Sequence, residues 1–164
     1  PRRPAHLHRV NASRLERSMA RIEFHFNAPA LVSYTCRLLR KVHTKGLHAQ
    51  VVGHSNTLAQ LDQALWTFSQ LDFLPHCMAN AQPAVLQASR VLLTERPHPD
   101  WARQILVNLG ESVPEGFETF ERIIDVVSVD DLHRAQGRER WRQYSRLGHE
   151  LVRHDLAPAS AGGA

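Results

Sequence analysis

A short stretch near the C-terminus, HRAQGRERWRQYSRLG (residues 133–148), concentrates the side chains that could bind a charged partner. It holds five arginines, one tryptophan and one tyrosine. In a helix, a stripe roughly 100° wide would collect five residues of this stretch: Arg134, Arg138, Trp141, Arg142 and Ser145. Guanidinium groups bind carboxylates through charge-assisted hydrogen bonds, and a neighbouring ring offers an apolar wall to a partner's aromatic side chain. The stripe therefore predicts a site for an acidic peptide with a free C-terminal carboxylate.

Two other interpretations of the stripe stay open. It could be a solvated helix face, or a general patch for nucleic acid, because arginine and tryptophan also suit phosphates and bases. Arg140 and Arg146 lie outside the stripe and are predicted to be plain surface charges. Tyr144 lies at its edge, while Leu147 and Leu151 are predicted to point away from it, toward the core.

Sequence signatures of catalysis and phosphate binding are absent. The chain has no G-x-G-x-x-G or G-x-x-x-x-G-K-[ST] motif, and the turn after the first predicted strand, HFNAPA, has no glycine. Ser55 in GHSNT lacks the second glycine of a nucleophile elbow and is predicted to cap a helix. The helix dipole accounts for Asp130 and Asp131 at a predicted helix start. We therefore expect no catalytic residue and no cofactor.

The eleven histidines and two cysteines show no metal-ligand spacing. The sequences H-x-x-x-H, H-E-x-x-H and C-x-x-C do not occur, so no metal site is predicted, and the histidines are expected at the surface or at helix ends. Cys36 and Cys77 are isolated thiols, as is typical of a reducing cytosol. No apolar run approaches the roughly eighteen residues of a membrane span. We expect a cytoplasmic protein.

Short apolar runs alternate with helical patterns through the middle of the chain. Five runs are predicted to be strands: ARIEFHF (20–26), HAQVVGH (48–54), RVLLTE (90–95), QILVNLG (104–110) and IIDVV (123–127). Strands separated by helical crossovers predict an α/β fold, with a mostly parallel sheet of about five strands and helices on both faces. Such a fold is Rossmann-like, but here it lacks a phosphate-binding loop.

Four helices are predicted between and after these strands: residues 28–46, 55–66, 114–122 and 128–148. The first should end at Gly46. The last should begin at Ser128, with Asp131 completing a capping box, and end at Gly148. Gly137 inside it costs about 1 kcal/mol relative to alanine and is expected to loosen the helix.

The basic charge of the chain is confined to its ends. Residues 1–18 hold five arginines and one glutamate, which equals the whole net charge of +4. The remainder is balanced, although residues 132–164 sum to +3. This distribution differs from the uniformly basic surface of a duplex DNA binder. We expect a flexible basic arm or upstream extension at 1–18, one domain at 19–155 and a disordered tail at 156–164.

Four segments resemble, in order, the chi subunit of bacterial DNA polymerase III: LDQALWTFSQLDFLPH, ILVNLG, FERIIDVV and GRERWRQYSRLG. The resemblance covers roughly residues 19–150. It implies an α/β fold reminiscent of nucleotide-binding domains without their phosphate loop. It also implies a non-catalytic accessory subunit, which joins the psi subunit of the clamp loader and holds the acidic tail of single-stranded DNA-binding protein (SSB).

The resemblance also implies which residues bind these partners. The SSB tail ends in a proline and a phenylalanine with a free carboxylate, and Arg134, Arg138, Trp141 and Arg142 match the family's tail-binding positions. The family often has lysine and tyrosine where this chain has arginine and tryptophan. For psi, the family uses a tryptophan and a phenylalanine seven residues apart, which Trp66 and Phe73 match. Packing in the core is the alternative role for these two rings.

The predicted function is therefore a link between two parts of the replication machinery. One end would dock on the clamp-loader assembly through psi or an equivalent partner, and the other would hold the SSB tail. Two alternatives remain at this point. The chain could be a small nucleotide-binding protein or enzyme on the same scaffold, or it could bind single-stranded DNA directly through the arginine-rich helix.

Overall fold

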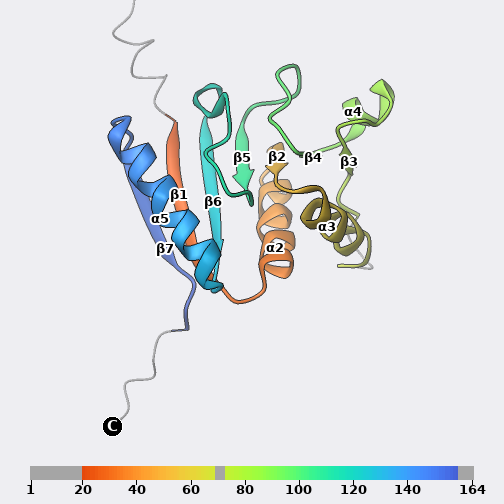
Figure 1. Cartoon of the computed structure of the whole chain (residues 1–164). Helices are drawn as coiled ribbons and strands as arrows, with labels where there is room; N and C mark the ends of the chain where they lie inside the picture. The colour runs from red at the N-terminus through yellow and green to blue at the C-terminus, as the bar shows by residue number, and fades with distance from the viewer. Residues whose placement is uncertain (1–19, 69–72, 159–164) are drawn as a thin grey trace, which may run out of the picture.

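The computed structural model describes residues 20–68 and 73–158, which form an α/β fold around one parallel sheet (Figure 1). The predicted arm at 1–18 and residues 159–164 of the predicted tail lie outside the described residues. Among the described helices, none is long and apolar enough to cross a bilayer.

The sheet has seven strands in the order β3-β4-β2-β5-β6-β1-β7, and every pairing is parallel. Five strands match the predicted ones: β1 (Arg21–Ala28), β2 (Ala49–Val52), β4 (Val91–Thr94), β5 (Ile105–Asn108) and β6 (Arg122–Ser128). The predicted fold class is confirmed, but two edge strands, β3 (His76–Met78) and β7 (Leu151–Asp155), were not predicted. They were missed because β3 has only three residues and β7 is polar and mostly exposed, so neither forms an apolar run.

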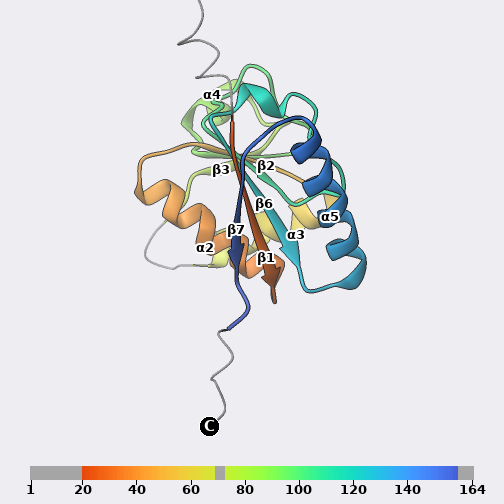
Figure 2. The ribbon, with the colours of Figure 1, turned by 90° about the vertical axis from the view of Figure 1, so that its left-hand side faces the viewer.

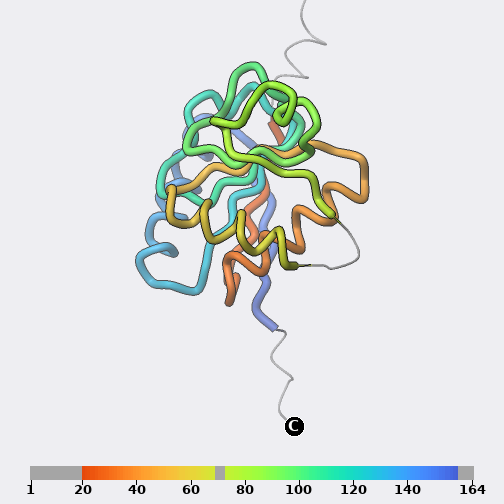
Figure 3. Tube along the Cα trace, turned by 90° about the vertical axis from the view of Figure 1, so that its right-hand side faces the viewer, coloured from red at the N-terminus to blue at the C-terminus, as the bar shows by residue number. Residues whose placement is uncertain are grey.

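Helices cover both faces of the sheet, as predicted. Helices α2 (Leu31–Thr44) and α3 (Ser55–Thr67) pack on one face, and α5 (Asp131–Arg146) packs on the other. Figure 2, viewed along the β7 edge, shows α2 and α5 on opposite sides of the strands. Figure 3, viewed from the opposite edge, shows the chain around the short helix α4 (Pro83–Ala88) and its following loops. Each face has its own apolar core cluster.

Several predicted helix boundaries are corrected. Asp130 caps α5 in place of Ser128, because its side chain accepts a hydrogen bond from the backbone N–H of His133 at 2.9 Å. Ser55 is instead the first residue of α3, and His54 precedes it as the cap, with no side-chain capping hydrogen bond among the described residues. The predicted ends at Gly46 and Gly148 are confirmed, since both glycines adopt the left-handed conformation that ends helices.

Two further predictions are wrong: the helix expected at residues 114–122 and the packing expected for Leu147. The segment 114–122 forms only a 3-10 turn, η1 (Phe117–Thr119), because left-handed Gly116 precedes it and Phe117 and Phe120 turn into the core. Leu147 is 58% exposed, because it caps the end of α5, just before the chain turns at Gly148 toward β7. Leu151 packs against the core as predicted.

Candidate functional site

A cleft of about 570 Å³ lies between β1 and α5. Side chains alternate along β1, so Phe24 and Phe26 both face α5. The cleft is lined by nine residues: Phe24, Phe26, Asn27, Val127, Arg134, Gly137, Arg138, Trp141 and Arg153. Three are arginines and none carries a carboxylate. The cleft therefore combines positive charge with an apolar, aromatic wall.

The aromatic wall is built from both elements. Trp141 meets Phe24 edge to face, with ring centroids 5.1 Å apart and planes at 67°. The guanidinium of Arg153, on β7, lies 5.1 Å from the ring centre of Phe26 and 5.8 Å from that of Trp141. Such cation–π contacts hold a guanidinium flat against rings and leave its N–H groups available for an anion.

The three cleft arginines are held differently. Arg134 Nη2 donates a 2.7 Å hydrogen bond to Asn27 Oδ1, and Asn27 Nδ2 donates to Asp155 Oδ1 at 2.8 Å. Arg153 is stacked on the rings. Arg138 is exposed at the cleft and has no hydrogen bond or ion pair within the described part of the chain. Of the three cleft arginines, Arg138 is thus the one whose guanidinium is most available to bind a partner.

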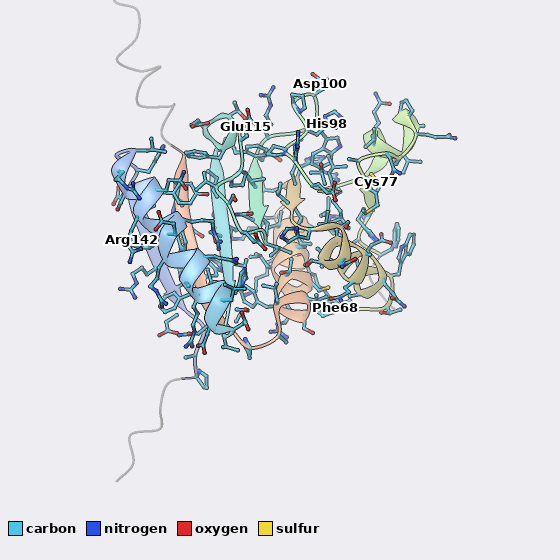
Figure 4. All side chains as sticks on the ribbon, in the orientation of Figure 1. Phe68, Cys77, His98, Asp100, Glu115 and Arg142 are labelled. Atoms are coloured by element: carbon cyan, nitrogen blue, oxygen red, sulfur yellow. The ribbon has the colours of Figure 1, made fainter. Side chains whose placement is uncertain are left out.

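Of the four residues predicted to bind the SSB tail, the structure brings three together. Arg134, Arg138 and Trp141 line the cleft, whereas Arg142 does not. Arg142 projects outward from α5 (Figure 4), where its Nη1 donates to Glu139 Oε2 at 3.1 Å. Sequence reasoning overlooked Glu139, one turn away on the same helix, which takes up this guanidinium.

Sequence reasoning also missed Phe26, Asn27 and Arg153 as members of the cleft. The alternation in ARIEFHF placed Phe24 and Phe26 on one face, but nothing in the sequence shows which helix packs there. Nothing in the sequence indicated that Arg153 would reach the cleft, since its strand was not predicted. These residues meet only because β1 pairs with β6 on one side and β7 on the other.

Arg140, predicted to be a surface charge, is buried and anchors α5 to the sheet. Its Nε and Nη2 donate to the two carboxylate oxygens of Asp125 at 2.9 and 2.8 Å, and its Nη1 donates to the Glu111 carbonyl at 2.9 Å. Asn108 donates to the same carboxylate at 3.1 Å. Burial raises the pKa of Asp125, and the charge of Arg140 acts against that rise. The prediction failed because Gly137, Arg140 and Tyr144 form the buried face of the helix.

Gly137 brings α5 and β6 close together. The helix runs through it without a break, contrary to the expected loosening. A Cβ at this position would lie 2.9 and 3.0 Å from the two methyl groups of Val127. Because valine has a stiff, branched side chain, the helix itself would have to move. The glycine is required by this contact.

We expect Gly137→Ala to destabilise the protein, although alanine favours helices. Overpacking against Val127 should cost about 1–3 kcal/mol, which offsets the gain of about 1 kcal/mol in helix propensity. Denaturant unfolding of the variant measures the net change. The matched control is Ala135→Gly, which makes the reverse change at an exposed position of α5 and should lose about 1 kcal/mol. If Gly137→Ala instead stabilised the protein, α5 would have room at this contact.

His133, in the first turn of α5, links the stability of this region to pH. Its Nδ1 accepts a 2.9 Å hydrogen bond from the backbone N–H of Ser128. Burial, together with the charge of Arg140, lowers the pKa of His133 below its ordinary value of 6.5. The folded state therefore favours the neutral ring, and protonation favours the unfolded state.

We expect the melting temperature to fall as the pH is lowered from about 6.5 through the folded-state pKa of His133. Above that range, this contribution to stability is fully present. In the variant His133→Asn, whose side chain can accept the same hydrogen bond without titrating, the decline should be shallower. Calorimetric scans between about pH 5 and 8 compare the two proteins. If the melting temperatures of the two proteins changed in parallel with pH, His133 would have the same pKa in the folded and unfolded states.

A second surface feature, the aromatic cluster of Trp66, Phe73 and His76, lies at the β3 edge of the sheet; His76 is buried and the other two rings are exposed. Trp66 and Phe73 are 58% and 59% exposed, with ring centroids 5.2 Å apart. Trp66 also meets the ring of His76 edge-on at 4.9 Å. The two predicted psi-binding residues therefore lie together at the surface, and the alternative that they pack in the core is wrong.

A parallel α/β domain with a basic, aromatic cleft and a separate exposed aromatic cluster has the features of a binding domain. Comparison with known families agrees: the family model described as DNA polymerase III chi subunit, HolC, matches residues 19–152. The chain belongs to this family of replication accessory subunits.

Two relatives support the assignment. The chain is 30% identical to the DNA polymerase III subunit chi of Pseudomonas aeruginosa over 145 residues, which cover 84% of this chain and 98% of that protein. It is 28% identical to the DNA polymerase III subunit chi of Haemophilus influenzae over 120 residues, which cover 71% of this chain and 81% of that protein.

Proposed function

We propose that this chi subunit holds the acidic C-terminal tail of SSB in the cleft between β1 and α5, and docks through its aromatic cluster on psi or an equivalent clamp-loader partner. Its contribution to replication is then linkage rather than catalysis. Because the family belongs to the replicative polymerase, we expect it to act where DNA is copied, in the cytoplasm. The observation that carries the proposal is the exposed Arg138 beside Trp141 in a cleft without carboxylates.

The chemistry of the cleft suits a peptide that ends in a phenylalanine. The ring of that residue would lie on the floor formed by Val127 and Gly137, against the wall formed by Trp141. Its carboxylate would pair with Arg138, and the preceding aspartates would lie near Arg134 and Arg153. Two or three such pairs, at about 1.5–3 kcal/mol each before ordering costs, suggest micromolar affinity. Several SSB tails on one strand of DNA would raise the apparent affinity through avidity.

Fluorescence anisotropy of a labelled SSB tail peptide tests the proposal. We expect saturable micromolar binding that weakens with added salt, because the cleft is open to solvent. A scrambled acidic peptide and a single-stranded oligonucleotide should bind more weakly. If the oligonucleotide bound as tightly as the peptide, the cleft would be a general anion patch, and direct DNA binding would replace the proposal.

The aromatic cluster requires a separate test. The double variant Trp66→Ala, Phe73→Ala should lose binding to purified psi in a size-exclusion assay and keep its affinity for the tail peptide. Both side chains are more than half exposed, so the variant should stay folded. Unchanged binding of psi would show that another surface makes this contact.

A further inference from the structure

Three side chains that commonly bind metals meet on the face of β1 opposite the cleft. Glu23 and His25 lie on β1, and His154 lies on β7, paired with His25 in the strand register. One ligand atom from each side chain lies within 4.8 Å of the other two. His25 is buried, so the expectation that histidines lie at the surface or at helix ends is wrong here. Because His154 lies far along the chain from Glu23 and His25, no sequence spacing reveals the three together.

Two of the three separations between the ligand atoms approach those of a tetrahedral zinc site, and the third, between the two histidines, is within 4.8 Å. Glu23 Oε2 lies 3.3 Å from His25 Nε2 and 3.9 Å from His154 Nε2. Zinc binds such atoms at about 2.0–2.2 Å, which places tetrahedral ligands about 3.3–3.5 Å from one another. The main adjustment falls on His154, whose side chain is 46% exposed and has room to move. Two imidazoles and one carboxylate form a zinc ligand set whose fourth position is open.

The surroundings of His25 support its role as a ligand. Its Nδ1 forms a hydrogen bond with the hydroxyl of Tyr34 on α2. A hydroxyl can donate to this nitrogen or accept from it, so Nε2 can present its lone pair to a metal when Nδ1 carries the proton. Burial lowers the pKa of His25, which keeps the ring neutral near neutral pH.

Two arginines compete with a metal for Glu23. Arg122 Nη2 lies 2.6 Å from Oε2, and Arg21 Nε lies 3.1 Å from Oε1. Although burial acts to raise it, the hydrogen bond and charge of Arg122 hold the pKa of Glu23 below its ordinary value, so the carboxylate is ionised. The side chain of Arg21 is 65% exposed and can swing into solvent. A cation bound to Oε2 would have to compete there with Arg122, and the charge of Arg21 beside Oε1 would oppose its binding.

We propose that Glu23, His25 and His154 bind a zinc ion, which ties the edge strand β7 to β1. In the described part of the sheet, β7 pairs with β1 alone. Arg153, the residue before His154, points to the other face of β7 and stacks on Phe26 and Trp141 in the cleft. The metal would thus stabilise the strand that supplies one wall of the cleft.

Metal binding by the full-length, untagged protein tests the inference. Zn²⁺ affinity is measured by competition with a chromogenic chelator, and Co²⁺ serves as a spectroscopic probe, because tetrahedral Co²⁺ absorbs visible light. We expect one Zn²⁺ per chain and a rise in melting temperature with zinc. His154→Ala should weaken the affinity by roughly tenfold or more and remove the rise. The control His54→Ala removes another exposed histidine, one paired with Glu111 at 3.1 Å, and should change neither.

The variant Arg21→Ala separates a metal site from an ion-pair network. If a cation binds here, removal of the competing guanidinium should tighten zinc binding several-fold. Equal zinc affinity in wild type, His154→Ala and His54→Ala would overturn the inference, as would weaker binding by Arg21→Ala. The cluster would then be an ion-pair network around a buried carboxylate.

Discussion

Arg140→Met should lower the free energy of unfolding by about 3–5 kcal/mol, because it leaves the buried carboxylate of Asp125 without its charged partner. Both side chains of this pair are at most 1% exposed, and Arg140 uses three nitrogens to bind Asp125 and the Glu111 carbonyl. Methionine keeps much of the volume but provides no donor. Asn108 would then be the one remaining donor to Asp125 among the described residues, so Asp125 would take up a proton or draw in water, and either costs stability. Urea denaturation measures the loss.

Arg146→Met is the matched control on the same helix. Arg146 pairs only at the surface, with Glu139 at 3.1 Å, and its side chain is 68% exposed. Exposed pairs contribute little, so this variant should stay within about 1 kcal/mol of the wild type. The double variant Arg140→Met, Asp125→Leu should recover part of the loss, since it removes the unpaired charge as well. Equal losses for the two methionine variants would mean that Asp125 is solvated.

The sequence patterns predicted the central part of the fold well. Runs such as RVLLTE and IIDVV place apolar residues at consecutive positions, because central strands of a parallel sheet are buried on both faces. The helix of residues 55–66 was equally clear, since Leu58, Leu61 and Leu65 recur at helical spacing and are all buried. Where burial is complete and regular, hydrophobic periodicity is a sufficient signal.

The features that sequence patterns failed to predict are those in which tertiary contacts override the local pattern. Arg140 reads as a surface residue by type, and only its position three residues after Gly137 and four before Tyr144 hints at a buried face. Arg153 and His154 lie on an edge strand that backbone pairing with β1 holds in place. The partners that explain these residues lie on other elements: Asp125 on β6 binds Arg140, and Phe26 on β1 contacts Arg153.

The position of the cleft follows from the topology of the sheet. Neighbouring strands β1 and β6 are followed by helices on opposite faces, α2 and α5. In open α/β sheets, ligands bind outside the carboxyl ends of the strands at such a switch in direction. Here Asn27 and the first turns of α5 lie at that switch. The chain has no phosphate loop, and arginine side chains supply the positive charge.

Arg138→Ala should weaken binding of the SSB tail peptide roughly ten- to a hundredfold, since it removes about 1.5–3 kcal/mol of charge-assisted hydrogen bonding. A peptide whose C-terminus is amidated should lose a similar amount against the wild-type protein. The decisive comparison combines the two changes. If Arg138 binds the terminal carboxylate, the variant should bind the free-acid and amidated peptides almost equally, because the interaction is already lost.

Two further arginine variants separate this contact from the general charge of α5. Arg142→Ala removes a guanidinium that is held by Glu139 outside the cleft, and Arg146→Ala removes one that the same glutamate holds farther along the helix. Both should weaken binding only slightly and should discriminate between the two peptides as the wild type does. If Arg138→Ala also discriminated as the wild type does, the carboxylate would lie elsewhere, with Arg134 and Arg153 as its remaining partners in the cleft. The energetic coupling between Arg138 and the terminal carboxylate of the peptide therefore tests where in the cleft the end of the tail binds.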